Sequence, residues 1–136
     1  TQRILLPGVR KTLTNFHQAG LTCALISNDS HSGIEDFLSH NNLRILIQDF
    51  WSADDLPPKP DPNAVKIFCK KLNLHPSECA LIGDADSDLE MARKSGISIT
   101  IGYTGGWIKK PDLSHHQHLI HDWSEIDVPG NIKIQE

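Results

Sequence analysis

The sequence lacks the features of a protein that crosses a membrane or binds nucleic acid. No uninterrupted apolar run approaches the ~20 residues that a helix needs to span a bilayer. The first eight residues hold no long apolar run of the kind that marks a signal peptide. Basic residues are too few for a concentrated positive face, with 13 Lys and Arg against 17 Asp and Glu. We therefore expect neither a membrane nor a nucleic acid as a partner.

Cysteine is scarce as well. The three cysteines, Cys23, Cys69 and Cys79, are odd in number and widely spaced, and each has apolar neighbours. This pattern favours buried free thiols over a structural disulfide, and free thiols persist in a reducing compartment. The expected location is therefore cytoplasmic.

What the sequence does contain is an alternation of short apolar runs with amphipathic stretches, over a length that suits one domain. This alternation predicts an α/β layered fold. The predicted strands are Leu21–Ile26, Ile45–Trp51, Glu78–Ile82 and Ile97–Ile101, and the predicted helices are Val9–Ala19, Gly33–His40, Asn63–Leu72, Asp86–Ser95 and a short one at Trp123–Ile126.

Polar side chains stand where the predicted strands end. Ser27 and Asn28 follow the first strand, Lys59 lies in a proline-rich loop, and Asp84 and Asp88 follow the third strand. Ligands of open parallel sheets bind outside the carboxyl ends of the strands, so these groups can meet at one site. Each residue alone has an ordinary structural explanation, such as a helix cap, a solvated lysine or a turn. The ordered set at these boundaries is what indicates a site.

These residue types suggest phosphoryl transfer, which needs donors and cations around the phosphoryl oxygens and usually Mg²⁺. Ser27 can donate a hydroxyl hydrogen bond, and Lys59 offers the compact charge that suits a phosphate. Asp84 offers the hard carboxylate oxygen that Mg²⁺ accepts beside waters and substrate oxygens.

Three stretches of the chain also carry a family resemblance. The sequence LISNDS occupies Leu25–Ser30, KPDP occupies Lys59–Pro62, and LIGDADSDLEMARKSG occupies Leu81–Gly96. In this order they resemble motifs II, III and IV of the haloacid-dehalogenase superfamily, and its phosphoglycolate phosphatases in particular. The resemblance runs from about Leu6 to Trp123. It implies a Rossmann-like parallel sheet with flanking helices.

The resemblance implies a role for each polar residue at the strand ends. Ser27 and Lys59 are implied as catalytic residues: Ser27 donates to the transferring phosphoryl group, and Lys59 neutralises charge on the nucleophile and the phosphate. Asn28 assists phosphate binding through its backbone. Asp84 is implied as a ligand of the cofactor Mg²⁺, and Asp88 supports the metal directly or through water. The implied substrate is a small phosphorylated metabolite.

The sequence departs from the family at motif I, a strand that ends in Asp-x-Asp and supplies the nucleophile and the general acid/base. No acid occurs among the 26 residues before Ser27, and Arg3–Leu6 leads into Pro7 and Gly8 instead. Without the Asp-x-Asp pair there is no covalent carboxylate catalysis. We therefore expect residues 1–136 to be the C-terminal part of a catalytic core, lacking the motif I strand and inactive alone.

Three explanations of the missing motif stay open. The chain is a fragment, or a second chain or segment supplies the motif I strand, or catalysis has been lost. Only 31 residues separate Ser27 from Lys59, so a cap domain would belong upstream, between motifs I and II.

The leading hypothesis is a Mg²⁺-dependent phosphomonoester hydrolase. The alternatives are a phosphomutase or a dehalogenase on the same scaffold, or an inactive remnant used for binding or regulation. Lys59 together with Asp84 favours phosphate chemistry, because dehalogenation needs no Mg²⁺.

The resemblance also makes a structural prediction. In the family, the motif I strand lies between the strands of motifs II and IV. Here Leu21–Ile26 and Glu78–Ile82 should therefore be separated by a gap of one strand and form no direct ladder. The alternative is that Arg3–Leu6 folds into that slot.

Overall fold

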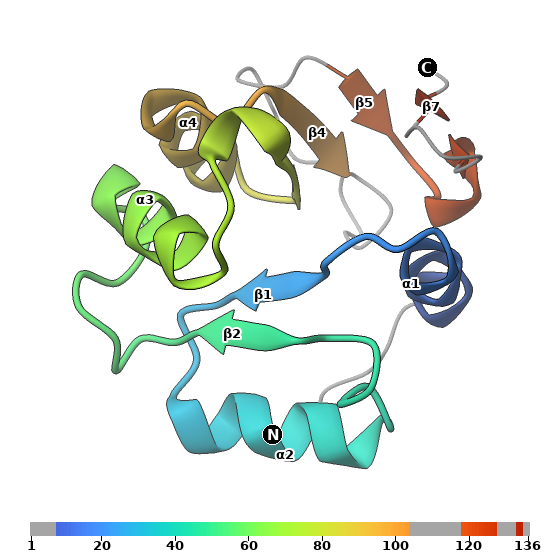
Figure 1. The fold of residues 1–136 in the computed structure, drawn as a ribbon, viewed down its shortest axis with the longest axis horizontal. Helices are drawn as coiled ribbons and strands as arrows, with labels where there is room; N and C mark the ends of the chain where they lie inside the picture. Colours follow the sequence, from blue (N-terminus) through green and yellow to red (C-terminus); the bar gives the residue numbers. More distant parts are fainter. Residues whose placement is uncertain (1–7, 104–117, 128–132, 135–136) are drawn as a thin grey trace.

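The structure is a computed structural model that describes residues 8–103, 118–127 and 133–134. Helices alternate with strands along most of this length, which confirms the predicted α/β class (Figure 1). None of the described helices is long and apolar enough to cross a membrane. The helices are α1 (Val9–Gln18), α2 (His31–His40), α3 (Pro62–Lys71) and α4 (Asp86–Ser95), with short 3₁₀ helices η1 (Pro76–Glu78) and η2 (Trp123–Glu125). The strands are β1 (Ala24–Ile26), β2 (Asp49–Trp51), β3 (Ala80–Gly83), β4 (Ile99–Tyr103), β5 (His118–Ile120), β6 (Ile126–Asp127) and β7 (Lys133–Ile134).

Two parallel sheets form the centre of the fold. β1 pairs with β2, with Ile26 opposite Trp51, and a second sheet has the order β3-β4-β5, with Gly83 opposite Gly102. α2 connects β1 to β2 and α4 connects β3 to β4, because parallel neighbours need a crossover. β6 and β7 form a small antiparallel pair. The predicted parallel arrangement with flanking helices is confirmed.

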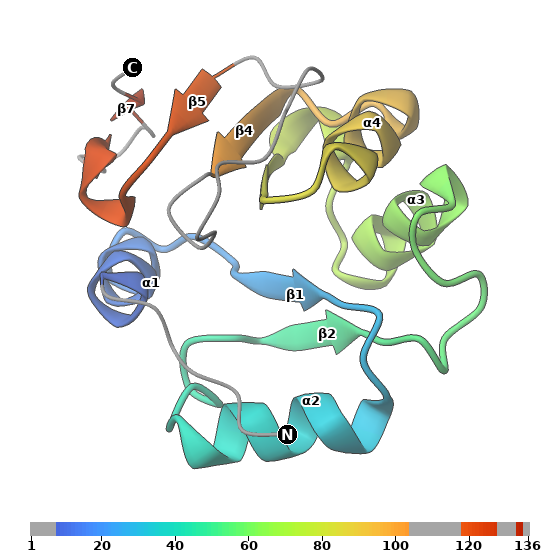
Figure 2. The ribbon, with the colours of Figure 1, turned by 180° about the vertical axis from the view of Figure 1, so that it is seen from behind.

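β1 and β3 lie in different sheets, as predicted, and no ladder joins them within the described ranges (Figures 1 and 2). Each of these strands has one edge without a strand partner in the part of the chain that the structure describes. All of β3 is only half-buried and Ala24 in β1 is exposed, whereas most of β4 is buried. Parallel strands are normally covered on both faces. The alternative occupant of the gap, Arg3–Leu6, falls outside the described residues.

Side chains from both sides of this gap share hydrophobic clusters. Ile26 of β1 and Leu81 of β3 pack against one cluster, to which α3 and α4 contribute. A second cluster contains residues of α1, β4 and β5. Leu21, just before β1, and Ile82 of β3 both pack against it. Side-chain packing therefore connects the two sheets.

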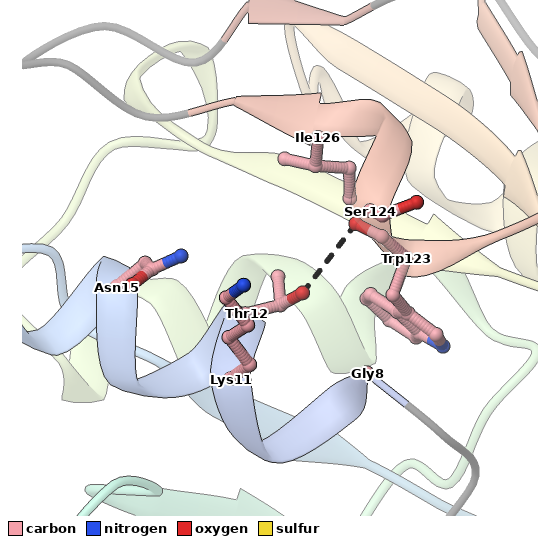
Figure 3. A pocket seen from close by; sticks show the side chains of 7 residues that line it. All are labelled: Gly8, Lys11, Thr12, Asn15, Trp123, Ser124 and Ile126. Carbon is pink, nitrogen blue, oxygen red and sulfur yellow. Dashed lines mark hydrogen bonds between the residues drawn. The ribbon is translucent and has the colours of Figure 1, made fainter.

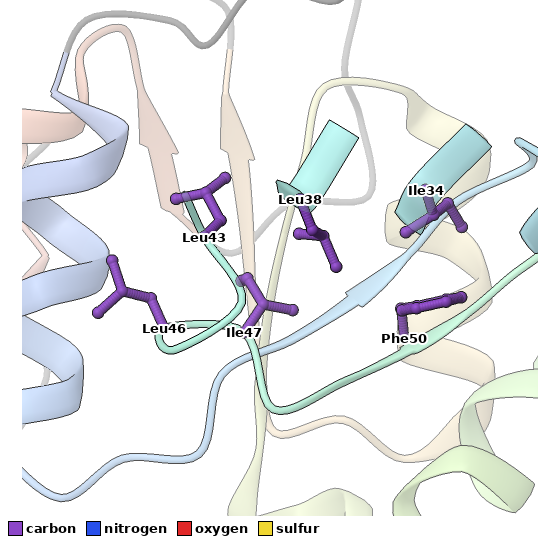
Figure 4. Packing of buried hydrophobic residues seen from close by; sticks show 6 residues of the cluster. All are labelled: Ile34, Leu38, Leu43, Leu46, Ile47 and Phe50. Atoms are coloured by element: carbon purple, nitrogen blue, oxygen red, sulfur yellow. The ribbon is translucent and has the colours of Figure 1, made fainter. Parts of the chain in front are cut away.

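α2 lies alongside the β1–β2 sheet (Figure 1). Ser30 begins this helix, since its side chain accepts a hydrogen bond from the Gly33 N–H at 3.1 Å. The buried side of α2 packs against β2 and the turn after the helix. The cluster between them, drawn in Figure 4, consists of Ile34, Leu38, Leu43, Leu46, Ile47 and Phe50.

Some strand boundaries were predicted wrongly. In the predicted strand Ile45–Trp51, the N–H groups of Leu46 and Ile47 both donate to the Leu43 carbonyl at 2.9 Å, so this apolar run forms a buried turn and β2 begins later. Glu78, predicted at the start of a strand, lies in η1. β4 lies two residues nearer the C-terminus than predicted.

The three cysteines are free thiols, as predicted. Cys69 on α3 is buried, whereas Cys23 and Cys79 are half-buried. Burial, together with the nearby Cys79 side chain, raises the pKa of the Cys69 thiol to about 12. Because the thiolate is the nucleophile, Cys69 is a poor one at neutral pH.

We expect Cys69 to resist alkylation in the folded chain. At pH 8 a thiol with a pKa of about 12 is ionised to roughly one part in 10⁴, whereas an ordinary cysteine is ionised to roughly a quarter. Iodoacetamide labelling at pH 8, followed by mass spectrometry of the peptides, should show Cys69 reacting at least ~10²-fold more slowly in the folded chain than in the urea-unfolded chain. Equal rates in the two states would contradict this expectation.

Candidate functional site

Ser27 and Asn28 lie directly after β1, in the loop that leads into α2. The Ser27 N–H donates to the Trp51 carbonyl at 2.9 Å, which extends the pairing with β2 by one residue. The Ser27 side-chain oxygen accepts from the Asp29 N–H at 3.1 Å. The Ser27 hydroxyl hydrogen therefore stays available to a ligand oxygen. Ser27 is half-buried and Asn28 is exposed.

The loop that carries Lys59 begins with a turn built on Ser52, which is 0% exposed. The Ser52 N–H and hydroxyl both donate to one carboxylate oxygen of Asp55, at 2.7 and 3.0 Å. The Ser52 oxygen also accepts from the Asp54 N–H at 3.1 Å. These three bonds fix the path of the chain as it leaves β2 toward Lys59.

Sequence reasoning missed how this loop is joined to its neighbours. The Asp54 carboxylate accepts from the His31 N–H at 2.9 Å, which links the loop to the start of α2. The Trp51 indole N–H donates to the Pro57 carbonyl at 2.8 Å. A serine followed by two acids after a strand is a recognisable turn signal. The partners of those acids come from the fold and have no signal in the sequence.

Removal of the Ser52 hydroxyl should destabilise the fold. Ser52→Ala leaves the part-buried Asp54 N–H and the Asp55 carboxylate each without one partner, so we expect a loss of about 1–3 kcal/mol in the free energy of unfolding. Urea unfolding followed by circular dichroism measures this loss. The matched control is Ser39→Ala, an exposed position on α2 that should change stability by only a few tenths of a kcal/mol. Equal effects at the two serines would refute the role assigned to Ser52.

Lys59 and Asp88 form an ion pair, with 3.0 Å between the Lys59 Nζ and the Asp88 Oδ1. Both side chains are largely shielded from water, at 18% and 13% exposure. Lys59 comes from the loop before α3, and Asp88 comes from the first turn of α4. Two of the predicted site residues, 29 positions apart, are thus brought together by the fold.

Asp84 follows β3 and is exposed. Gly83, just before it, must be small: a Cβ there would lie 3.2 Å from the Asp88 Cβ, so the end of β3 passes very close to α4. Asp84 also lies near the end of β4. Burial raises the pKa of the Tyr103 phenol, and the charges of Asp122 and Asp84 raise it further.

The metal-binding role of Asp84 and Asp88 stays a prediction. In the part of the chain that the structure describes, no group of three or more His, Cys, Asp or Glu side chains could hold a metal ion. Mg²⁺ is often held by one or two carboxylates, with waters and substrate oxygens completing its shell. The carboxylate oxygens of Asp84 and Asp88 are of the ligand type that Mg²⁺ requires.

A separate pocket of about 320 Å³ lies between α1 and η2 (Figure 3). The Thr12 hydroxyl donates to the Trp123 carbonyl across its edge at 3.4 Å. None of the predicted site residues lines it, so it is not the candidate site. The lining residues are Gly8, Lys11, Thr12, Asn15, Trp123, Ser124 and Ile126.

The profile of haloacid dehalogenase-like hydrolases matches residues 2–101, which is most of the chain. The chain belongs to this family. A curated relative, the phosphoglycolate phosphatase of Vibrio vulnificus (strain CMCP6), is 32% identical over 106 residues, which are 75% of this chain and 46% of the relative. The chain therefore spans about half the length of the curated relatives it matches.

Solved structures of the family have the same fold. A predicted phosphoglycolate phosphatase from Haemophilus somnus 129PT has a TM-score of 0.70 and 25% identity, covering 74% of this chain and 45% of that one. The structure of a dehalogenase has a TM-score of 0.78 and 26% identity, covering 88% of this chain and 54% of that one. Ser27, Lys59, Asp84 and Asp88 all lie within the matched range of the family profile.

Proposed function

We propose that this protein is a Mg²⁺-dependent phosphomonoester hydrolase that acts on a small phosphorylated metabolite. The observation that carries the proposal is the shielded ion pair between Lys59 and Asp88. It joins the proline-rich loop to the start of α4, so that a cation stands beside the carboxylate of Asp88. A dianionic phosphate with a metal ion needs this alternation of charge. The similarity to phosphoglycolate phosphatases supports the same chemistry.

Each residue has a distinct part in the proposed reaction. The free hydroxyl hydrogen of Ser27 donates to a phosphoryl oxygen, and the backbone at Asn28 adds to the same cradle. Lys59 carries the positive charge that offsets charge developing on the transferred group. Asp84 and Asp88 would hold Mg²⁺, which when bound supplies further charge neutralisation at the phosphate. Asp88 also holds Lys59 in position through their ion pair.

The nucleophile must come from a motif I strand that occupies the gap between β1 and β3. Each of these strands has an edge with no strand partner among the described residues, and both strands contact the same hydrophobic clusters, which supports this location. A strand between two parallel neighbours would also complete their hydrogen bonding. We propose that an upstream segment or a second chain supplies it, and that any cap domain lies upstream as well. The three free thiols support a cytoplasmic location.

A dehalogenase is the second candidate, because one structural neighbour bears that description at 26% identity. A phosphatase needs the metal and a phosphate cradle, whereas a dehalogenase needs neither. The paired Lys59 and Asp88, together with Asp84, favour the phosphatase. An inactive binding protein is the third candidate.

The test begins with the coding sequence upstream of Thr1, which should encode a strand ending in Asp-x-Asp. The longer product is then assayed against a panel of phosphomonoesters, with Mg²⁺ and with EDTA, and against 2-haloacids. Hydrolysis of a phosphomonoester that EDTA abolishes supports the proposal. Release of halide without Mg²⁺ would establish the dehalogenase instead, and a folded product inert in all assays would favour the binding protein.

A further inference from the structure

A second cleft lies at the end of α3 that is distant from the loop carrying Lys59. It has a volume of about 430 Å³, which falls in the range of small-molecule sites. Within residues 8–103, 118–127 and 133–134, no carboxylate is among the side chains that line it. The lining residues are Lys66, Lys70, Asn73, Leu74, His75, Pro76 and Ser95.

Two uncompensated ammonium groups border this cleft. Lys66 and Lys70 are four residues apart on α3, so they share one face of the helix, where like charges are mildly destabilising. Neither forms an ion pair with any residue in the described ranges, whereas Lys59, Lys71 and Lys94 each pair with an acid. Lys70 also complements the carbonyl end of the helix, but Lys66 lies too early in α3 for that role.

His75 adds a third donor. Its ring Nδ1 accepts from the Ser77 N–H at 3.3 Å and lies 2.8 Å from the Ser77 hydroxyl. A neutral imidazole that accepts at Nδ1 carries its proton on Nε2, which keeps a donor on the other side of the ring. The backbone of His75 is held too, because its N–H donates to the Glu78 carboxylate at 2.9 Å.

We propose that this cleft binds an anion with two or more negative charges, of the phosphate or pyrophosphate class. Two lysine charges and an imidazole N–H match such an anion, since lysine binds phosphate as a point charge. Leu74 and Pro76 give the cleft an apolar part on which the carbon skeleton of an organic phosphate can rest. The proposal is independent of the proposed hydrolase function, because the cleft and the candidate site share no residue.

The test is a titration of the ¹⁵N-labelled chain with pyrophosphate, without metal and at constant ionic strength, followed by NMR. The expected result is a saturable shift of the amide signals between Lys66 and Ser77. The double variant Lys66→Gln/Lys70→Gln should weaken binding by about tenfold or more. Lys94→Gln should change it by less than about twofold, because Lys94 is exposed on α4 and already pairs with Glu90.

Three outcomes would overturn the proposal. The first is the absence of a saturable shift. The second is a weakening by Lys94→Gln of about threefold or more, which is half of the double variant's effect on a logarithmic scale. Because Lys94→Gln removes one charge and the double variant removes two, this result would mean that pyrophosphate follows only the net charge. The third is a shift that Lys59→Gln abolishes while the double variant leaves it intact, which would place the anion at the candidate hydrolase site. Thermal unfolding of each variant confirms that the chain is folded.

Discussion

The 136-residue chain alone should show no Mg²⁺-dependent turnover of p-nitrophenyl phosphate. It has a hydroxyl donor in Ser27, a cation in Lys59 and carboxylates in Asp84 and Asp88, but no acid precedes Ser27 in its sequence. Groups that stabilise a transition state give only residual catalysis when the attacking group is missing. We expect a rate that Mg²⁺ does not change and that is indistinguishable from buffer with heat-treated protein.

A co-purifying phosphatase is the main risk in this assay, so the control is the variant Asp84→Asn purified in the same way. Asp84 is exposed, so the substitution should leave the fold intact. Equal background in both preparations agrees with the prediction. Turnover that survives a second purification and disappears in Asp84→Asn would mean that this chain carries its own nucleophile.

The helices of this protein could be predicted closely because their ends have local signals. Pro62 fits the first turn of α3, with Asp61 capping it, and Gly96 ends α4 with a φ of 93° that favours glycine. The predicted limits of α4 agree with the structure. These signals act within one turn of the helix, so they do not depend on the rest of the fold.

The limits of the strands were harder to predict, because an apolar run in the sequence does not indicate whether its backbone is extended. Ile45 to Ile47 is as apolar as a strand, yet Leu46 and Ile47 are buried in a turn beneath α2, and Ile45 is 77% exposed. The separation of β1 from β3 was predicted from the family resemblance, since nothing in the periodicity of either strand indicates its neighbour.

In the candidate site, too, some features could be predicted from the sequence and others depend on the fold. That Ser27, Lys59 and Asp84 follow strands or lie in loops could be predicted from the chain. The contact between Lys59 and Asp88 could not be predicted from the chain. Lys59 has a long flexible side chain, and the packing of the helices determines which acid lies within its reach. From the sequence, Lys59 was predicted to contact the phosphate and Asp88 to support the metal. The structure adds that the two side chains form an ion pair with each other.

Lys59→Ala and Asp84→Asn should each lower kcat by about 10²-fold or more in the active enzyme that includes a motif I strand. Lys59 carries a largely shielded positive charge, and Asp84 is the residue that we propose gives Mg²⁺ a hard oxygen ligand. The two losses should differ in their metal dependence. Asp84→Asn should raise the Mg²⁺ concentration for half-maximal rate, whereas Lys59→Ala should lower kcat at saturating Mg²⁺.

Matched controls separate these roles from structural ones. Lys59→Ala leaves Asp88 without its partner, so its thermal unfolding is compared with that of Lys71→Ala, which breaks the more exposed pair with Asp49. Lys71→Ala should retain nearly full kcat.

Asp86→Asn is the control for Asp84→Asn. Asp86 is the first residue of α4, where an acid is favoured by the helix dipole, so its loss should cost little activity. Similar losses at Asp84 and Asp86, with the same shift in the Mg²⁺ requirement, would mean that the metal ligand is misassigned. A kcat of Lys59→Ala within a few fold of the parent enzyme would show that the ion pair with Asp88 only holds α4 in place, and that another group neutralises the phosphate.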